Sequence, residues 1–85
     1  MLGSSLSMSE NHCEITLDLS GLLCPLPVLK ASKRLGALQA GEVLTVIATD
    51  PMSVIDMPHF CVEQGHTLLE QFQDGATYTF RIRRK

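Results

Sequence analysis

The chain is poor in aromatic residues, with no tryptophan, three phenylalanines and one tyrosine among 85 residues. Proteins that bind single-stranded nucleic acids stack the bases on exposed aromatic rings, so this scarcity argues against that class of binding module. The net charge of −2 also provides no general attraction for nucleic acid. We therefore expect a core built from Leu, Val and Ile and no direct nucleic-acid binding.

Long apolar runs and targeting signals are also missing. No stretch approaches the length of a membrane-spanning helix, and residues 1–11 lack the basic start and apolar centre of a secretory signal. We expect a cytoplasmic protein without membrane contact. Residues 1–12 are serine-rich and patternless, which predicts a disordered tail, and the remaining length suits a single domain at residues 13–85.

Cysteine occurs only three times, at Cys13, Cys24 and Cys61. An odd number in a chain without an export signal is typical of reduced thiols rather than of a disulfide framework. The chain has no Cys-x-x-Cys pair, because Pro27 stands where the second thiol would follow Cys24. Cys24 therefore lacks a neighbouring thiol that could resolve a mixed disulfide.

The hydrophobic pattern predicts six elements in the order βαβαββ. Apolar residues alternate or run continuously in strands expected at residues 15–19, 42–48, 68–72 and 78–82. Helical spacing predicts a first helix at residues 25–38 and a second that begins at Pro51 and stops at Gly65. We expect a two-layer α/β sandwich, in which a four-stranded mixed sheet carries both helices on one face.

Local signals refine these elements. Asp50 is suited to cap the second helix and Pro51 to its first position, while Pro58 predicts a kink or an initial turn before the helix proper. Asp74-Gly75 predicts the two-residue turn of a final antiparallel hairpin. The apolar side chains assigned to the second helix are Val54, Ile55, Met57, Cys61 and Val62.

Cys24 is the strongest candidate for chemistry. It precedes Pro25, which suits the first position of a helix and holds the thiol at the helix start, and Pro27 stiffens the same junction. Unpaired N–H groups and the positive end of the helix dipole stabilise a thiolate there, so we expect a thiol that ionises readily. The alternative is that Cys24 is only a small residue at a helix start.

A single accessible thiolate is suited to accept a sulfur atom from a persulfide and to pass it on, since each transfer needs one attacking thiolate. Cys61, at core spacing, is expected to be buried and inert. The spacing of His59, Cys61 and His66 is unlike that of structural zinc sites, so we expect neither a metal nor another cofactor.

Charged residues each have a structural and a functional interpretation. Asp50 is either only a cap of the second helix or also lies beside the Cys24 thiol, in which case the reactivity of the thiol depends on Asp50. A basic face formed by Lys30, Lys33 and Arg34 is either solvated or docks an acidic partner. The basic C-terminal run of Arg81, Arg83, Arg84 and Lys85 is either a solvated strand end or an RNA-binding surface.

Taken together, several short motifs resemble those of the TusA/SirA family of small sulfur-carrier proteins over about residues 15–84. These motifs are Leu17-Asp18, Gly21-Leu22, Cys24-Pro25-Leu26-Pro27, Gly41-Glu42, Thr49-Asp50-Pro51, Asp56 with Pro58, Phe60-Cys61 and Gly65-His66. The Cys-Pro-x-Pro element is the family's signature. The resemblance implies the same βαβαββ sandwich and implies that Cys24 carries sulfane sulfur as a persulfide.

The resemblance also implies a place in a sulfur relay, as a sulfurtransferase-type carrier rather than an enzyme for small molecules. The expected donor is a cysteine desulfurase or a rhodanese-like protein, and the expected acceptor is a complex of the TusBCD/DsrE type. The sulfur would serve tRNA 2-thiolation, molybdenum-cofactor formation or sulfur oxidation. The alternatives are a non-catalytic RNA-binding or regulatory module and, less favoured without a resolving cysteine, a redox sensor.

Overall fold

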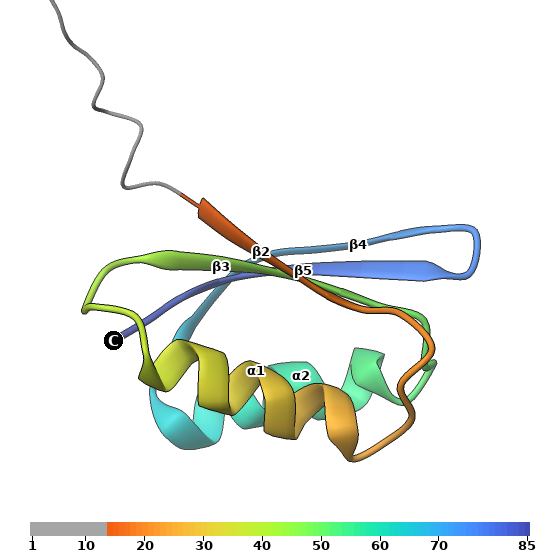
Figure 1. Cartoon of the computed structure of the whole chain (residues 1–85), viewed down its shortest axis with the longest axis horizontal. Helices are drawn as coiled ribbons and strands as arrows, with labels where there is room; N and C mark the ends of the chain where they lie inside the picture. Colours follow the sequence, from red (N-terminus) through yellow and green to blue (C-terminus); the bar gives the residue numbers. More distant parts are fainter. Residues whose placement is uncertain (1–13) are drawn as a thin grey trace, which may run out of the picture.

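The computed structural model describes residues 14–85, which form two layers. In chain order the elements are β2 (Glu14–Leu19), α1 (Leu26–Gly36), β3 (Val43–Ala48), α2 (Ser53–Gln64), β4 (Thr67–Asp74) and β5 (Thr77–Arg83). The sheet has the order β2-β3-β5-β4, and both helices cover the same face of it (Figure 1). β2 and β3 are parallel, whereas β5 is antiparallel to β3 and to β4. The predicted βαβαββ sandwich with a mixed sheet is confirmed.

The sequence also predicts a disordered tail and the absence of a membrane-spanning helix. The disordered tail predicted at residues 1–12, and Cys13, lie outside the described residues. Within residues 14–85 neither helix is long and apolar enough to cross a membrane. The longer one, α2, has 12 residues, whereas a membrane-spanning helix needs about 20.

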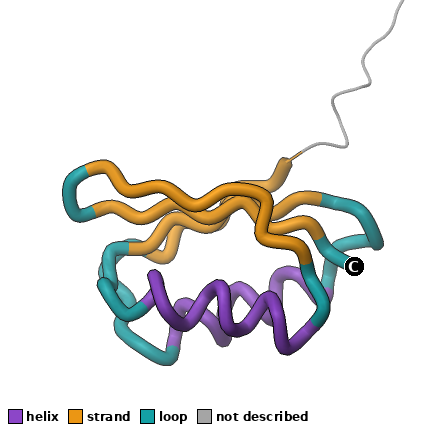
Figure 2. The backbone as a smooth tube through the Cα atoms, turned by 180° about the vertical axis from the view of Figure 1, so that it is seen from behind, coloured by secondary structure: helices purple, strands orange, loops and turns teal. Residues whose placement is uncertain are grey.

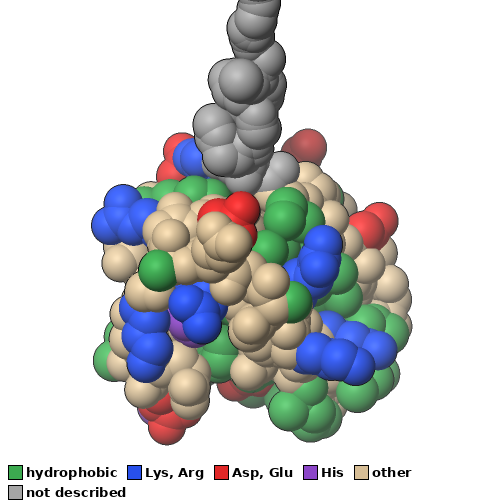
Figure 3. Space-filling view, turned by 60° about the vertical axis from the view of Figure 1, so that its left-hand side comes forward, with side chains coloured by type: hydrophobic (Ala, Val, Ile, Leu, Met, Phe, Trp, Pro, Cys, Tyr) green, Lys and Arg blue, Asp and Glu red, His purple; other side chains and the backbone are tan. Residues whose placement is uncertain are grey.

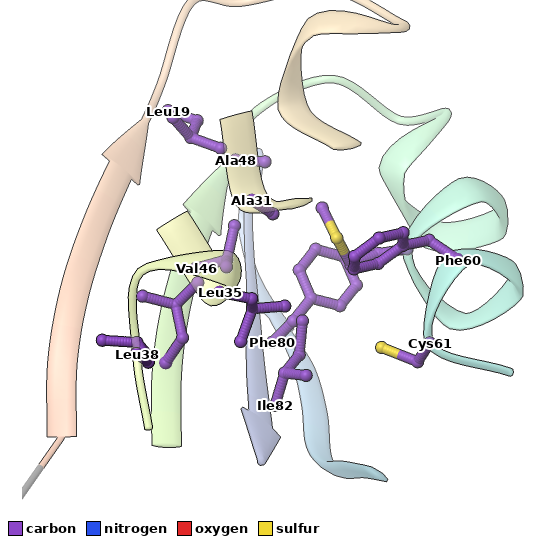
Figure 4. Close-up of a cluster of buried hydrophobic side chains, with 12 residues drawn as sticks. Leu19, Ala31, Leu35, Leu38, Val46, Ala48, Phe60, Cys61, Phe80 and Ile82 are labelled. Carbon is purple, nitrogen blue, oxygen red and sulfur yellow. The ribbon is translucent and has the colours of Figure 1, made fainter. Parts of the chain in front are cut away.

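The core lies between the sheet and the two helices. Side chains of Phe60 and Cys61 from α2 meet those of Phe80 and Ile82 from β5 in this layer (Figure 4). Among residues 14–85 the buried hydrophobic cluster consists of Leu19, Ala31, Leu35, Leu38, Leu44, Val46, Ala48, Met57, Phe60, Cys61, Phe80 and Ile82. Burial of this aliphatic surface supplies the main stabilisation of the fold, as the composition predicts.

β3 is the central strand that the sequence predicts. Leu44, Val46 and Ala48 are fully buried against the helices, and the residues between them are half-buried on the opposite face. The strand has a paired neighbour on each side. A nearly continuous apolar run is typical of such an interior position, because little of it reaches water on either face.

α1 is shorter than predicted at both ends. It begins at Leu26, with Pro25 as the N-cap residue rather than the first helical residue, and the Cys24–Pro25 peptide bond is cis. At the other end the N–H groups of Ala37 and Leu38 donate to carbonyls three residues earlier, at 3.0 Å each. This tighter pattern ends the α-helix at Gly36 although Leu38 still packs into the core.

α2 begins at Ser53 rather than at Pro51. The N–H of Ser53 donates to the Asp50 carbonyl at 2.9 Å, which forms an initial turn before the helix proper. The helix continues through Pro58 and ends at Gly65, whose φ of 80° is accessible to glycine without strain. The predicted stop is confirmed, whereas the break expected at Pro58 is not seen, because the initial turn lies before Ser53 and the helix is continuous from Ser53 to Gln64.

Only part of the apolar set assigned to α2 is in the core. Met57 and Cys61 are buried, whereas Val54, Ile55 and Val62 are exposed. Met57 and Cys61 are four residues apart and therefore share one face of the helix. The exposed apolar residues of α2 are thus available at the surface.

The final hairpin forms as predicted, but its turn is displaced by one residue. Asp74 pairs with Thr77, so the two loop residues are Gly75 and Ala76 rather than Asp74 and Gly75. Gly75 has a φ of 62°. Glycine is favoured at the first loop position of such a turn because a side chain there would be strained.

Candidate functional site

The site lies at the end of the molecule where the parallel strands β2 and β3 finish. Two loops meet there, one from β2 to α1 and one from β3 to α2 (Figure 2). The N–H of Gly21 in the first loop donates to Oγ1 of Thr49 in the second at 2.9 Å. The carboxyl ends of parallel strands are where α/β folds place ligand-binding and reactive groups.

Asp50 joins these loops directly beneath Cys24. One of its carboxylate oxygens, Oδ2, accepts the backbone N–H of Cys24, and the other, Oδ1, accepts the N–H of Met52 at 3.1 Å. The residue is only 7% exposed. The prediction that Asp50 caps α2 is wrong, because the N-cap residue is Met52 and no side-chain cap hydrogen bond forms. Asp50 instead closes the turn before the helix and lies beside the cysteine.

The Cys24 side chain is exposed and points to α2. Its Sγ donates a hydrogen bond to Oδ2 of Asp56 at a distance of 3.0 Å. A shallow pocket of about 280 Å³ adjoins the thiol, and on α2 the imidazole Nε2 of His59 lies 3.3 Å from Oε2 of Glu63. The pocket is lined by Cys24, Pro25, Val28, Asp56, His59, Phe60 and Glu63.

The expectation of an easily ionised thiol is wrong for the free protein. The pKa of Cys24 is raised above its ordinary value, first by the hydrogen bond to Asp56, then by partial desolvation and by the charges of Asp56 and Asp50. Each of these effects disfavours a thiolate.

The start of α1 does little to stabilise a Cys24 thiolate against these effects. Pro25 and Pro27 have no N–H, and the N–H of Leu26 is already donated to the Leu23 carbonyl at 2.8 Å. The prolines that mark the motif therefore remove two of the donors on which the expected stabilisation depends. Pro27 is itself buried in the first turn of α1, where it anchors the helix start.

Cys61 differs from Cys24 in every respect that matters for reactivity. It is 2% exposed, and desolvation raises its pKa to about 11. A buried neutral thiol is a poor nucleophile. The prediction that Cys61 is a buried core residue is confirmed.

Asp56 is the site residue to which sequence reasoning assigned no role, although it appears in the motif with Pro58. It is separated from Cys24 by 32 residues. A sequence signal did exist, since Asp56 lies in the first turn of α2 and that turn starts beside Asp50. The contact with sulfur depends on how α1 and α2 are placed on the sheet.

The predicted basic face is present but extends away from the thiol. Lys30, Lys33 and Arg34 are exposed on α1, and the last two are in its final turn. At 1.5 Å per residue, Arg34 lies about 12 Å along the helix from Leu26. The residues next to Cys24, Asp50 and Asp56 in the sequence are instead exposed apolar ones. They are Leu23 (68% exposed), Leu26 (43%), Met52 (45%) and Ile55 (64%).

Comparisons with known proteins agree with this geometry. The family model described as "Sulfurtransferase TusA" matches residues 15–84. The chain is 50% identical over 78 residues to "Sulfur carrier protein TusA" of Pseudomonas entomophila, covering 92% of this chain and 98% of that protein. It is 48% identical over 68 residues to the protein of the same name in Allochromatium vinosum, covering 80% and 90% of the two chains.

A solved structure shares the fold. The crystal structure of a SirA-like protein from Desulfitobacterium hafniense superposes with a TM-score of 0.73 and 31% sequence identity, covering 81% of this chain and 95% of that one. Sequence and structure therefore lead to the same assignment. The chain belongs to the TusA/SirA family of sulfur carrier proteins.

Proposed function

We propose that Cys24 is the residue that carries sulfur, in a relay from a cysteine desulfurase or rhodanese-like donor to an acceptor of the TusBCD/DsrE type. The observation that carries this proposal is the contrast between the thiols of the described residues, because Cys24 is exposed beside a pocket and Cys61 is buried. A carrier must present its sulfur to two proteins in turn, which a buried thiol cannot do.

The transfer is an exchange between sulfurs. The Cys24 thiolate attacks the terminal sulfur of the donor persulfide, the new Sγ–S bond forms, and the donor's S–S bond breaks with its electron pair on the departing thiolate. That thiolate takes up the proton that Cys24 gave up, so one thiol and one persulfide become one persulfide and one thiol. An acceptor thiolate then removes the outer sulfur by the same step.

The supporting residues have distinct roles in this proposal. Asp50 is a positioning residue, because its carboxylate holds the backbone N–H of Cys24. Pro25 and Pro27 hold the start of α1, and Lys30, Lys33 and Arg34 provide an exposed face to which a partner docks. The sulfur then serves tRNA 2-thiolation, molybdenum-cofactor formation or sulfur oxidation. A reducing cytoplasm fits the free thiols of Cys24 and Cys61.

The alternative of a non-catalytic RNA-binding module is less well supported. Two of the four cations in the C-terminal run are engaged within the fold: Arg81 is paired with Glu70 at 2.7 Å, and Nε of Arg84 donates to the Leu35 carbonyl at 2.9 Å. Figure 3 shows lysine and arginine side chains on the face that includes this end of the molecule. Salt-dependent tRNA binding that is lost on substitution of Arg83 and Lys85, but unchanged by Cys24→Ser, would favour the alternative.

The direct test is the mass of the intact protein after incubation with a cysteine desulfurase and cysteine. We expect a gain of one sulfur atom that a thiol reductant removes. Cys24→Ser should abolish this gain, and the matched variant Cys61→Ser should retain it. Equal labelling of the wild-type protein and Cys24→Ser would contradict the proposal.

A further inference from the structure

The carboxylate of Asp56 is placed to control when Cys24 can react. It accepts the hydrogen bond from Sγ at 3.0 Å and belongs to a different helix from the cysteine. The side chain is half-buried, and its backbone N–H donates to the Met52 carbonyl at 2.9 Å, which keeps it in the first turn of α2. The contact is therefore held by the packing of α2 on the sheet.

The charges that face the thiol are mainly negative. From the loop before α2 comes Asp50, and from α2 come Asp56, His59 and Glu63. His59 already lies 3.3 Å from Glu63. Within residues 14–85 Asp56 has no lysine or arginine paired with it, and none lines the pocket. An acidic site without an internal counter-ion is complementary to a cation on another molecule.

We propose that Asp56 is an electrostatic gate on Cys24: it holds the thiol protonated in the free protein, and a lysine or arginine of the docked sulfur-exchanging protein pairs with it and releases the thiolate. The raised pKa of Cys24, caused first by its hydrogen bond to Asp56, agrees with the closed state. The docked protein presents its reactive sulfur within an apolar surface that covers Leu23, Leu26 and Ile55, with a basic side chain beside it.

The gate has a chemical purpose if Cys24 carries sulfur, and in this respect the inference rests on the proposed function. A thiolate left permanently exposed reacts with oxidants and unrelated disulfides, whereas a thiol does so slowly. A paired ammonium or guanidinium competes for the Asp56 oxygens and offsets the closest negative charge, so the hydrogen bond and the charge effect that favour the thiol weaken together. Reactivity is thereby confined to complexes with the correct partner.

The first experiment measures the electrostatic field at Cys24 without any sulfur transfer. Methanethiosulfonates with a cationic or an anionic end react with the full-length protein at neutral pH, and peptide mass spectrometry follows Cys24 alone. We expect the cationic reagent to react about fivefold faster than the anionic one, the order of effect of one nearby charge. Asp56→Asn should remove most of this preference, and Asp56→Glu should retain it.

Asp74→Asn, a matched loss of one carboxylate at the hairpin, serves as the control and should leave the preference unchanged.

Neutral iodoacetamide should alkylate Cys24 of Asp56→Asn about tenfold faster than that of the wild-type protein, because less of the thiol is held protonated. If Asp56→Asn keeps both the wild-type charge preference and the wild-type alkylation rate, the gate is refuted. Circular dichroism establishes that each variant is folded.

The second experiment tests release by a cation during sulfur uptake. Cysteamine persulfide carries a cationic ammonium end, whereas the glutathionyl part of glutathione persulfide is net anionic, and both deliver one sulfur atom by the same exchange. We expect faster loading of Cys24 from cysteamine persulfide, and we expect Asp56→Asn to equalise the two donors by accelerating the anionic one. Equal loading of the wild-type protein from both donors would overturn the gate.

The two experiments separate the inference from the proposed function. Absence of loading of Cys24 from either persulfide, in a protein that still shows the charge preference with methanethiosulfonates, refutes the carrier function and leaves the Asp56 field established. Loading without any charge preference retains the carrier function and refutes the gate.

Discussion

The two ends of the helices α1 and α2 differ in the sign of the charged side chains that surround them. At the end where the helices begin, acidic side chains contact the thiol, and Asp50 and Asp56 bond Cys24 through its backbone and its sulfur. At the other end, basic and C-terminal groups close the fold, since Arg84 bonds the Leu35 carbonyl and the N–H of Lys85 donates to Nδ1 of His66 at 3.2 Å.

This difference explains why counting charges is a poor guide to function. At the C-terminal end a cation satisfies a helix carbonyl, which is the usual stabilising arrangement. At the Cys24 end two carboxylates lie beside an exposed thiol and raise its pKa. The basic C-terminal run is thus partly structural, whereas the acidic residues Asp50 and Asp56 contact the exposed cysteine.

At the Cys24 end, removal of the Asp50 side chain should cause the largest loss of stability. Asp50→Ala leaves the N–H groups of Cys24 and Met52 without their acceptor, and we expect the free energy of unfolding to fall by about 2 kcal/mol. Urea denaturation measures this change. Sulfur loading of the folded variant should also fall, and wild-type loading would show that the backbone contact does not position the thiol.

The buried thiol provides a pH test that sharpens the contrast with Cys24. The pKa of Cys61 is about 11 in the fold and 9.0 when unperturbed. Its contribution to stability is therefore complete below pH 9.0 and is lost as the pH rises toward about 11, by about 2 kcal/mol at most. Urea denaturation between these pH values should show a steeper loss for the wild-type protein than for Cys61→Ala. Parallel curves would contradict the assignment.

Breaking the opposite end should affect stability without changing the site. Arg84→Ala removes the donor to the Leu35 carbonyl at the end of α1, and we expect a loss of about 1 kcal/mol in the free energy of unfolding. The rate of Cys24 alkylation should stay at the wild-type value. A changed alkylation rate would mean that the two ends are coupled through α1.

The smallest effect on stability is expected from the exposed face that connects the two ends. Replacing Lys30, Lys33 and Arg34 together with glutamine should change the free energy of unfolding by less than about 0.5 kcal/mol, because surface charges contribute little. The rate of sulfur loading from the desulfurase should fall with a weaker salt dependence. An unchanged rate at low salt would exclude this face from docking.

Most of the fold was predictable because it depends on local patterns. Alternation defines the strands, helical spacing places Ala31 and Leu35 in the core, and Gly65 ends α2 by adopting a positive φ. The errors have local causes as well. Pro25 forms the N-cap rather than the first turn, and the hairpin uses Gly75-Ala76 because Asp74 still pairs with Thr77.

The candidate site was predictable only in part. The motif identifies Cys24, and the position of Asp50 after a parallel strand places it at the same edge of the sheet. Periodicity did not distinguish the exposed Ile55 from the buried Met57, because both are apolar residues of one short helix. Asp56 could not be assigned to the thiol from spacing, since it belongs to another helix.

The sequence by itself determined the order of the elements, the presence of a lone thiol at a helix start and the family to which the motif belongs. These properties follow from residue types and short spacings along the chain. Only the tertiary structure decided the state of that thiol, because it brings the carboxylates of Asp50 and Asp56 to Cys24 across 26 and 32 residues. A charge within a few ångströms outweighs a helix end from which two prolines have removed two of the N–H donors.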